Sequence, residues 1–448
     1  MEQQAFMELL FKKAKEQGFE AYEAHVIGGE SFKVTAEKGK IDEYKVSAIR
    51  GLGFRGMRNG RMGYAYTEVF DEAAAAMVAQ KAWENAGLID TDDPQFIYEG
   101  GGEYQTVEGW SQAIEAFSPE AKIALAIEME EAARVESPWV KSVRPSMALA
   151  ASHTVTLRNS KGLNLGHRCN SLLSYVCAII EKDGVMTDGD AYIAARNPGE
   201  IDGKALAREA VQKALAKLNA SPVASGKYPV LLDREAAMDL LGTYSGIFSG
   251  ESAQKGLSLL QGRVGETIAS PTVTLVDDPW LAGSAASAPF DGEGVPTQRK
   301  NIIDGGKLTT LLHNLKTAAK EGCPSTGNAQ KPSYKSSVGI DAFNLFFAPG
   351  SRSPEQMMHE TGKGLLITEL EGLHAGADTV SGDFSLAAKG YLIEGGQKSR
   401  PVEQITIAGN FYALLKDIVA VGNDLRMAPG GGVGSPTVWV RELSVAGE

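Results

Sequence analysis

The stretch GLGFRGMRNGRMGYAYT, residues 51–67, decides the fold expected for the first half of the chain. Apolar and polar side chains alternate on both sides of Asn59-Gly60, as in a strand with one buried face. Asn-Gly accepts the positive φ angles of a type I′ turn, so two strands flanking it form a tight hairpin. We therefore predict a β-hairpin here, within an antiparallel sheet.

The neighbouring segments extend this sheet and flank it with helices. Residues 21–67 are predicted as a run of short strands, with a second turn at Lys38-Gly39-Lys40. Residues 71–87 are predicted as a helix that Asp71 caps and Gly87 ends. Another helix follows at 118–135, with Ser118 as its cap and Pro119 at its first position.

The second half of the chain is predicted to be a separate β-rich domain. Strands at 139–196 and a helix at 201–219 complete the first part, and the small, flexible residues 219–227 suggest a boundary, giving domains 1–222 and 223–448. Beyond it we predict hairpins around Asp304-Gly305-Gly306 and Gly395-Gly396, with short helices near 313–321, 353–360 and 410–417. The expected fold class is α+β, with an N-terminal antiparallel sheet flanked by helices and a C-terminal β-barrel or sandwich-like domain carrying short helices.

Composition narrows the functional classes. The 448 residues carry a formal net charge of −12 and no Lys/Arg block, which argues against a nucleic-acid partner. The three cysteines, Cys169, Cys177 and Cys323, form neither a CxxC pair nor a disulfide framework. Because no secretory signal and no run of about 18 apolar residues occurs, we expect a cytoplasmic protein without a membrane partner.

The sequence contains incomplete pieces of metal-binding motifs. His359-Glu360 begins like a zinc helix, but the positions where a second histidine would complete it hold Lys363 and Gly364. An exposed helix C-terminus explains the pair. His167 and Cys169 would share one face of a strand, which is a conceivable metal pair, although strand packing explains them equally well.

The remaining motifs have structural explanations too. The glycine-rich loop APGGGVGSP, residues 428–436, lacks the GK[ST] ending of a phosphate-binding loop and is predicted to be a turn. Solvated turns explain the acidic pairs Asp277-Asp278 and Asp291/Glu293, unless partners from elsewhere in the chain converge on them in the fold. No GxSxG nucleophile motif occurs, so motifs alone show no catalytic set.

Several blocks in order nevertheless resemble the TldD/PmbA family, also called modulators of DNA gyrase. The blocks are GRVGETIASPTVTLVDDP (262–279), FDGEGVPTQRKNIIDGGKL (290–308), STGNAQ (325–330), VSGDFSLAAKGYLIEGG (380–396), PVEQITIAGN (401–410) and IVAVGNDLR (418–426). The hairpin at 51–67 resembles the glycine-rich hairpin of the same family, so the likeness covers nearly the whole chain.

The resemblance implies a zinc metallopeptidase built from two related chains. The TldD-type chain carries HExxxH on a helix and a cysteine near its C-terminus as the third ligand. Counting back from Val264-Gly265-Glu266 places HExxxH on Leu241 to Gly246, where Leu241, Gly242 and Gly246 replace the two histidines and the glutamate. The cysteine is missing as well, so the chain resembles the PmbA (TldE) type of subunit, and no residue of this chain is expected to be catalytic or to bind metal. Glycines disfavour helix, and we expect a loop or a broken helix there.

The resemblance therefore implies a subunit that is inactive alone and that acts with a zinc-bearing TldD-like chain on unfolded peptides, as in peptide-antibiotic maturation or antitoxin turnover. Zinc is expected only in that partner. The alternative is a non-catalytic homodimer that binds peptides or another protein. Asn328 and Asp383, in family-like loops, are candidate peptide contacts, although turn and packing roles fit them equally. A rebuilt metal site using His167, Cys169 or His374 is a third hypothesis.

Overall fold

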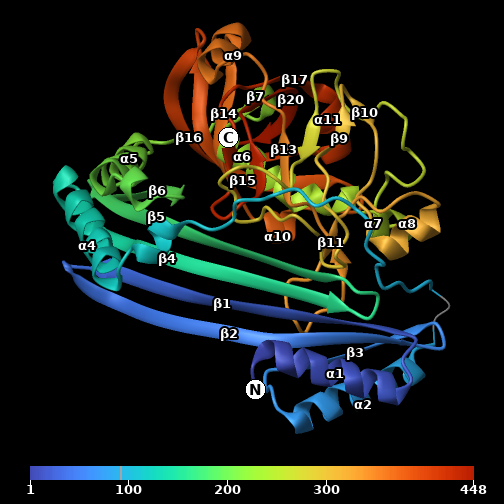
Figure 1. Ribbon diagram of the computed structural model, residues 1–448. Helices are drawn as coiled ribbons and strands as arrows, with labels where there is room; N and C mark the ends of the chain where they lie inside the picture. The colour runs from blue at the N-terminus through green and yellow to red at the C-terminus, as the bar shows by residue number, and fades with distance from the viewer. Residues whose placement is uncertain (91–92) are drawn as a thin grey trace.

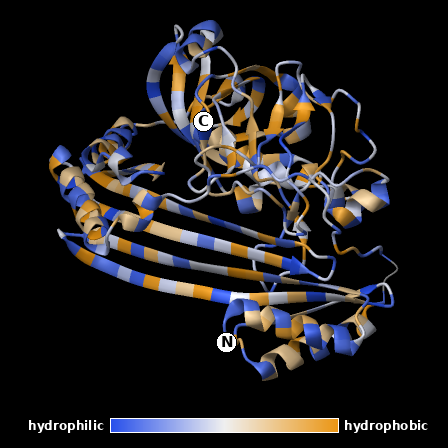
Figure 2. Ribbon diagram, in the orientation of Figure 1, coloured by the Kyte–Doolittle hydropathy of each residue, from blue (hydrophilic) through white to orange (hydrophobic). Residues whose placement is uncertain are grey.

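The structure is a computed structural model that describes residues 1–90 and 93–448 (Figure 1). Its N-terminal part is built on a six-stranded antiparallel sheet in the order β3-β2-β1-β4-β5-β6. The strands are β1 (Ala21–Glu37), β2 (Lys40–Arg58), β3 (Arg61–Thr67), β4 (Val140–Asn159), β5 (Asn164–Lys182) and β6 (Val185–Ala195). Hydrophilic and hydrophobic residues alternate along the long strands (Figure 2). The expected antiparallel sheet is confirmed.

The two predicted turns are confirmed, but the prediction of short strands is wrong. Asn59 and Gly60 have φ angles of 51° and 72°, and Lys38 and Gly39 have 53° and 69°. β1, which precedes the first of these turns, and β2, which joins the two turns, run for 17 and 19 residues, with one shift of register between Thr35 and Ala36. Some glycines inside the strands occupy positions where a side chain would clash with a neighbouring group. A Cβ on Gly29, for example, would lie 2.3 Å from the Ser152 carbonyl oxygen.

Two pairs of helices cover different ends of this sheet (Figure 1). α1 (Gln3–Gln17) and α2 (Glu72–Leu88) pack together and against β1–β3, whereas α4 (Pro119–Glu136) and α5 (Gly203–Ala216) pack against β4–β6. The short α3 (Gln112–Ala116) lies near β5.

Most of the predicted helix ends are observed. Asp71 accepts a hydrogen bond from Ala74 N, and Ser118 caps the helix that Pro119 begins, as predicted. Gly87 does not end its helix, because the helical conformation continues to Leu88. Gly87 is not among the glycines with positive φ, so it forms no left-handed C-cap, and the helix ends instead at Ile89 in an extended conformation.

The C-terminal part contains a sheet that closes into a barrel. Its order is β16-β15-β14-β7-β20-β17, and a further pairing of β16 with β20 closes the ring. The strands are β7 (Gly226–Leu232), β14 (Gly364–Glu371), β15 (Asp383–Glu394), β16 (Gln397–Asn410), β17 (Ile418–Val421) and β20 (Val438–Ala446). The barrel-like expectation and the α+β class are confirmed.

A second six-stranded sheet, in the order β10-β9-β8-β13-β19-β18, lies beside the barrel, and a small β11–β12 ladder accompanies it. The strands are β8 (Leu275–Asp277), β9 (Lys300–Asp304), β10 (Lys307–Leu308), β11 (Ala329–Gln330), β12 (Gly339–Ile340), β13 (Asn344–Phe347), β18 (Arg426–Met427) and β19 (Gly432–Ser435). The helices are α6 (Arg234–Tyr244), α7 (Gly250–Gln254), α8 (Leu315–Glu321), α9 (Pro354–Thr361), α10 (Leu373–Gly376) and α11 (Phe411–Asp417), with 3₁₀ turns η1 (Pro198–Glu200) and η2 (Ser245–Phe248). Both predicted hairpins and the three predicted short helices are present.

The chain passes from the first sheet to the barrel between the end of α5 at Ala216 and the start of β7 at Gly226. The expected boundary after residue 222 falls inside this connection. One face of the N-terminal sheet lies toward the C-terminal part across its width (Figure 1). Among the described residues, no helix is both long and apolar enough to cross a membrane.

Candidate functional site

The segment that the resemblance assigns to HExxxH is a broken helix. α6 continues through Gly242 to Tyr244, η2 follows at Ser245–Phe248, and α7 begins at Gly250. Asp233 starts α6 by accepting hydrogen bonds from Glu235 N and Ala236 N. The broken helix is one of the two predicted outcomes; the other, a loop, does not occur before Tyr244.

The side chains of this segment are used for packing. Leu241 and Tyr244 are fully buried in the core of the C-terminal part. The Tyr244 ring stacks on Phe411 with centroids 4.6 Å apart, and its hydroxyl donates to the Asp383 carbonyl oxygen at 2.8 Å. Burial raises the pKa of Tyr244 to about 12, so the hydroxyl keeps its proton. The segment thus contributes packing and one internal hydrogen bond.

The residues at these positions do not fit a zinc ion. α6 packs against β19, so the expected cysteine loop lies close to the helix, and a Cβ on Gly242 would lie 3.6 Å from Val433 Cγ1. Leu and Gly carry no lone-pair donor, and the loop at 428–436 contains no cysteine. Across residues 1–90 and 93–448, no group of three or more His, Cys, Asp or Glu side chains could hold a metal ion.

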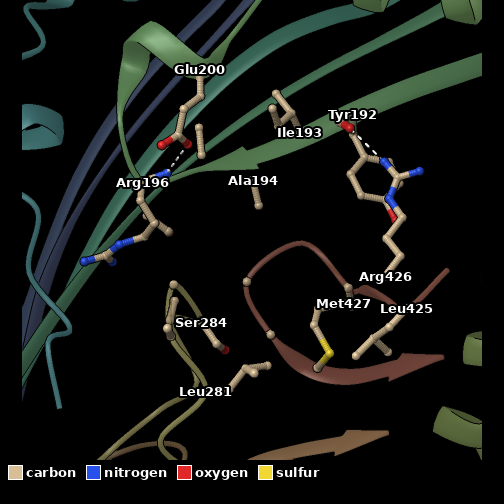
Figure 3. Close-up of a pocket in the computed structure, with 18 residues that line it drawn as sticks. Tyr192, Ile193, Ala194, Arg196, Glu200, Leu281, Ser284, Leu425, Arg426 and Met427 are labelled. Carbon is tan, nitrogen blue, oxygen red and sulfur yellow. Dashed lines mark hydrogen bonds between the residues drawn. The ribbon is translucent and has the colours of Figure 1, made fainter. Parts of the chain in front are cut away.

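A cavity of about 390 Å³ lies between the two parts of the molecule, close to α6 (Figure 3). We call it the edge cleft. It is lined by β6 and the turn after it, by the loop 281–285, and by residues 425–428 and 430–431 around β18. β6 is the last strand of the N-terminal sheet and β18 is the last strand of the second C-terminal sheet. Two sheet edges therefore border one cavity.

The charged side chains of the edge cleft are held by protein partners. Arg426 donates from Nη1 to Glu235 Oε1 and from Nη2 to the Tyr192 carbonyl oxygen, both at 2.8 Å, and its guanidinium lies 3.9 Å from the Tyr192 ring centroid. Arg196 donates from Nη1 to the carbonyl oxygens of Gly109 at 2.9 Å and Asn170 at 2.8 Å. These contacts fix the walls of the cleft.

The backbone of β6 offers hydrogen-bonding groups to the cleft. Backbone groups in a strand point alternately to its two sides, so the edge from which Tyr192 accepts the Arg426 bond also carries the N–H and C=O of Ala194. Ala194 is exposed and lines the cavity. An extended chain placed along β6 could pair with these groups.

The two candidate peptide contacts differ in availability. Asn328 is fully buried, and its amide donates to Asp277 Oδ2 at 2.8 Å and to the Asp341 carbonyl oxygen at 3.0 Å. Its oxygen accepts from Lys300 and Thr326, so its polar atoms are already engaged. Asp383 is exposed at the start of β15, where its carboxylate accepts from Asn410 and Ser381. Neither residue lines the edge cleft; their peptide contacts stay predictions.

Three of the four residues in the predicted acidic pairs are buried. Asp277 is fully buried and accepts from Lys300 Nζ at 3.1 Å and from the backbone N–H groups of Phe343 and Asn344. Asp291 and Glu293 are 2% and 4% exposed. Asp291 accepts from nearby Glu293 N and Val295 N but also from Ala329 N, and Glu293 accepts from Arg55 and Leu315 N. The solvated-turn explanation is therefore wrong for these three residues, and the alternative of converging partners holds.

The histidines of the metal hypotheses are dispersed. His167 and Cys169 share one face of β5 and line a second cavity with His25 and His153. His167 Nε2 lies 3.1 Å from the Ser287 carbonyl oxygen, which occupies one ring nitrogen. His374 is exposed on α10 and does not line that cavity.

His359 and Glu360 are exposed in the last turn of α9, as expected for a helix C-terminus. Glu360 pairs there with Arg352 at 3.4 Å.

A buried polar cluster on the N-terminal sheet was missed. Arg55 on β2 donates to Glu23 on β1 at 2.8 Å and to Glu293 of the C-terminal part at 3.1 Å. His25 and Lys331 lie beside this group: besides burial, the charges of Lys331 and Arg55 lower the pKa of His25, and the charge of Arg55 lowers that of Lys331. A signal existed in the sequence: Glu23 and His25 stand two apart in the otherwise largely apolar residues 21–27 at the start of β1, which puts both on one face.

Comparisons with known proteins agree with this architecture. Residues 22–86, 113–218 and 225–447 match, in order, models of PmbA/TldA metallopeptidase domain 1, of the central domain and of the C-terminal domain. The chain is 28% identical over 421 residues to Metalloprotease PmbA of Escherichia coli O157:H7, covering 93% of this chain and 90% of that protein.

Two solved structures share the whole fold. A Thermotoga maritima protein described as a candidate modulator of a DNA gyrase is 33% identical, with a TM-score of 0.92 and coverage of 99% of this chain and 100% of that one. TldE from Thermococcus kodakarensis is 24% identical, with a TM-score of 0.90 and the same coverage, which shows a common fold. With three domain models matched in order and a full-length relative at one-third identity, this chain belongs to the PmbA/TldD family of metallopeptidases.

Proposed function

We propose that this chain is the PmbA/TldE-type subunit of a two-chain metallopeptidase, with the zinc carried by a TldD-like partner. The observation that carries the proposal is the α6 segment: Leu241 is fully buried in the core and Gly242 lies against Val433, where the active chain would hold a histidine and the general base. An intact fold with apolar packing in place of ligands supports a role beside a catalytic chain. The likeness of this fold to that of TldE from Thermococcus kodakarensis supports the same assignment.

The chain's contribution is to bind the substrate. Unfolded peptides expose their backbone, and an extended backbone can add to a sheet edge through main-chain hydrogen bonds that do not depend on sequence. The edge cleft provides such an edge at Ala194. We propose that the cleft receives the peptide and that the partner hydrolyses it, in the cytoplasm, as in peptide maturation or antitoxin turnover.

An exposed apolar loop supports contact with a partner chain. Leu257, Leu259 and Val264 follow α7 and are 49%, 53% and 51% exposed. Three large apolar side chains exposed within eight residues form a surface suited to protein contact. The loop directly follows the α6–α7 segment, so a partner bound there would lie beside the position of the lost zinc site.

The test is reconstitution. Three mixtures each contain the purified chain and an unfolded peptide. The first has nothing else, the second also has a TldD-like chain from the same organism, and the third has that TldD-like chain with its HExxxH glutamate changed to Gln. Hydrolysis only in the second mixture is expected, together with a one-to-one complex by light scattering. Chelator-sensitive hydrolysis by this chain alone would contradict the proposal. A stable homodimer that binds the peptide and ignores the TldD-like chain would favour the alternative, a non-catalytic binding module.

A further inference from the structure

A second cavity, of about 340 Å³, lies between the N-terminal sheet and the C-terminal loops. We call it the histidine pocket. It is lined by His25 and His153 from the sheet and by Lys331, Asp341, Phe290 and Phe343 from the C-terminal part, among others. None of these residues lies at the family's zinc positions, and the proposed pairing with a second chain does not use the pocket. The inference therefore goes beyond the proposed function.

The polar groups beside this pocket are buried without partners. His25 is 3% exposed, and neither of its ring nitrogens has a hydrogen-bond partner within the described structure. Glu23 Oε2 and Arg55 Nη2 are also unpartnered, so three neighbouring residues supply four of the seven such atoms found in residues 1–90 and 93–448. Native proteins leave few buried polar atoms unpaired, and a cluster of them marks a site for something else.

The Lys331 ammonium group supplies a positive charge to the histidine pocket. Its side chain is 8% exposed, and within the described residues no carboxylate or carbonyl oxygen bonds its ammonium group. A Cβ on Gly53 would lie 3.0 Å from Nζ, so the ammonium sits over the glycine that faces His25 across the β1–β2 ladder. Burial and the nearby Arg55 charge lower the pKa of Lys331 to about 8, although the Glu23 charge partly offsets them, as expected for a buried ammonium that no carboxylate bonds directly.

The charged residues around the pocket determine whether it favours an anionic or a cationic ligand. Burial, together with the charges of Lys331 and Arg55, holds the pKa of His25 well below its usual value, so the ring is neutral and can donate one N–H. Asp291 and Asp341 also line the pocket, but burial and Glu293 raise the pKa of Asp291 to about 8, and burial raises the pKa of Asp341, so their negative charge is reduced. Lys331 has no ion-pair partner among the described residues, which favours an anionic ligand. Phe290 and Phe343, which also line the pocket, are 6% and 5% exposed and offer apolar surface. The pocket therefore combines an anion site with room for an apolar group.

We propose that the histidine pocket binds the carboxylate of an apolar residue, held by hydrogen bonds from Lys331 Nζ and the His25 ring. Two ligands share this chemistry, a free small carboxylic acid and the C-terminus of a peptide. The histidine pocket and the edge cleft both include Ala285, so the two cavities are neighbours.

The test uses the whole chain and four probes: N-acetyl-leucine, N-acetyl-leucinamide, and an N-acetylated tetrapeptide ending in leucine with a free or an amidated C-terminus. Binding is followed by ligand-observed NMR. The acids should bind at least about tenfold more tightly than their amides, because a charge-assisted hydrogen bond is lost in the amide. Binding of only N-acetyl-leucine assigns a small acid, and binding of both acids assigns a peptide C-terminus.

Two lysine variants complete the test. Lys331→Met keeps the length of the side chain without the charge and should weaken binding of the acids by about tenfold or more. Lys335→Met removes an exposed lysine of the same loop, which pairs with Glu68 at 2.9 Å, and should leave binding unchanged. Equal binding of acid and amide to the unmodified protein, no binding of either acid at millimolar concentration, or full binding by Lys331→Met would each overturn the proposal.

Discussion

Arg55 Nη1 donates a hydrogen bond to Glu293 Oε1 at 3.1 Å, although 238 residues separate the two in the sequence. Arg55 also donates to Glu23 at 2.8 Å, and Glu293 Oε2 accepts from Leu315 N at the start of α8. One buried guanidinium thereby links two strands of the N-terminal sheet to a loop and a helix of the C-terminal part. The relative position of the two parts, and of the cavities between them, depends on this link.

Arg55→Met should therefore destabilise the protein strongly. The substitution leaves two buried carboxylates, Glu23 and Glu293, without their cation, and breaking such a buried pair costs about 3–5 kcal/mol. The expected result is a lower urea midpoint. As a control, Lys255→Met removes a lysine that pairs with Glu251 at 2.9 Å and whose side chain is 60% exposed, and should have little effect. Equal midpoints for both variants would show that the Arg55 link does not hold the two parts.

Leu241→His should destabilise the fold and gain no metal. Leu241 is fully buried in the core, and an imidazole there loses apolar packing and leaves its nitrogens without partners, at a cost of about 2–4 kcal/mol. Leu241→Met keeps volume and polarity and should cost less than about 1.5 kcal/mol. Urea denaturation compares the two. A stable Leu241→His protein that binds zinc would mean that a latent ligand set remains at α6.

His25 should make stability depend on pH. Its folded-state pKa lies well below its usual value of 6.5, so below pH 6.5 the unfolded chain binds a proton that the folded chain does not. The free energy of unfolding must then fall as pH falls, by about 1 kcal/mol between pH 6.5 and 5.5 for this one group, because the unfolded histidine is already half protonated at pH 6.5. In His25→Gln this contribution is absent, and the difference between the two proteins should shrink with falling pH. A constant difference from pH 7.5 to 5.5 would contradict the assignment.

Ala194→Pro should impair peptide cleavage by the reconstituted pair. Proline removes the backbone N–H that β6 presents to the edge cleft, while an edge strand tolerates proline on its unpaired side. We expect a raised KM, by about fivefold for one lost hydrogen bond of about 1 kcal/mol. Met186→Pro is the matched control, because Met186 lies on the same side of β6 but outside the cleft. Equal KM values for both variants would exclude strand addition at this edge.

The sequence predicted those features that local physics controls. Asn59-Gly60 and Lys38-Gly39 set the hairpins because their φ angles are available to few other residues, and Asp71 and Ser118 cap helices by hydrogen bonds within four residues. Strand length was underestimated because it depends on the neighbouring strands: β1 lies between β2 and β4 and therefore stays extended through Gly28-Gly29.

The candidate site was predictable only where the family pattern reached it. The lost ligand positions at Leu241, Gly242 and Gly246 could be read by counting along matched blocks. The cluster around Arg55 and Lys331 could not, because Arg55 meets Glu293 only once both parts have folded, and no spacing in the sequence encodes that contact. The burial of Asp277 and Asp291 escaped prediction for the same reason.

Whether this chain lacks a zinc site of its own is decided by elemental analysis of the purified, tag-free protein, with hydrolysis of an unfolded peptide measured on the same sample. We predict essentially no zinc and no hydrolysis by this chain alone, with both appearing when a TldD-like chain is added. Stoichiometric zinc with chelator-sensitive hydrolysis by the chain alone would contradict this prediction, and His167, Cys169 and His374 would then be the first residues to change.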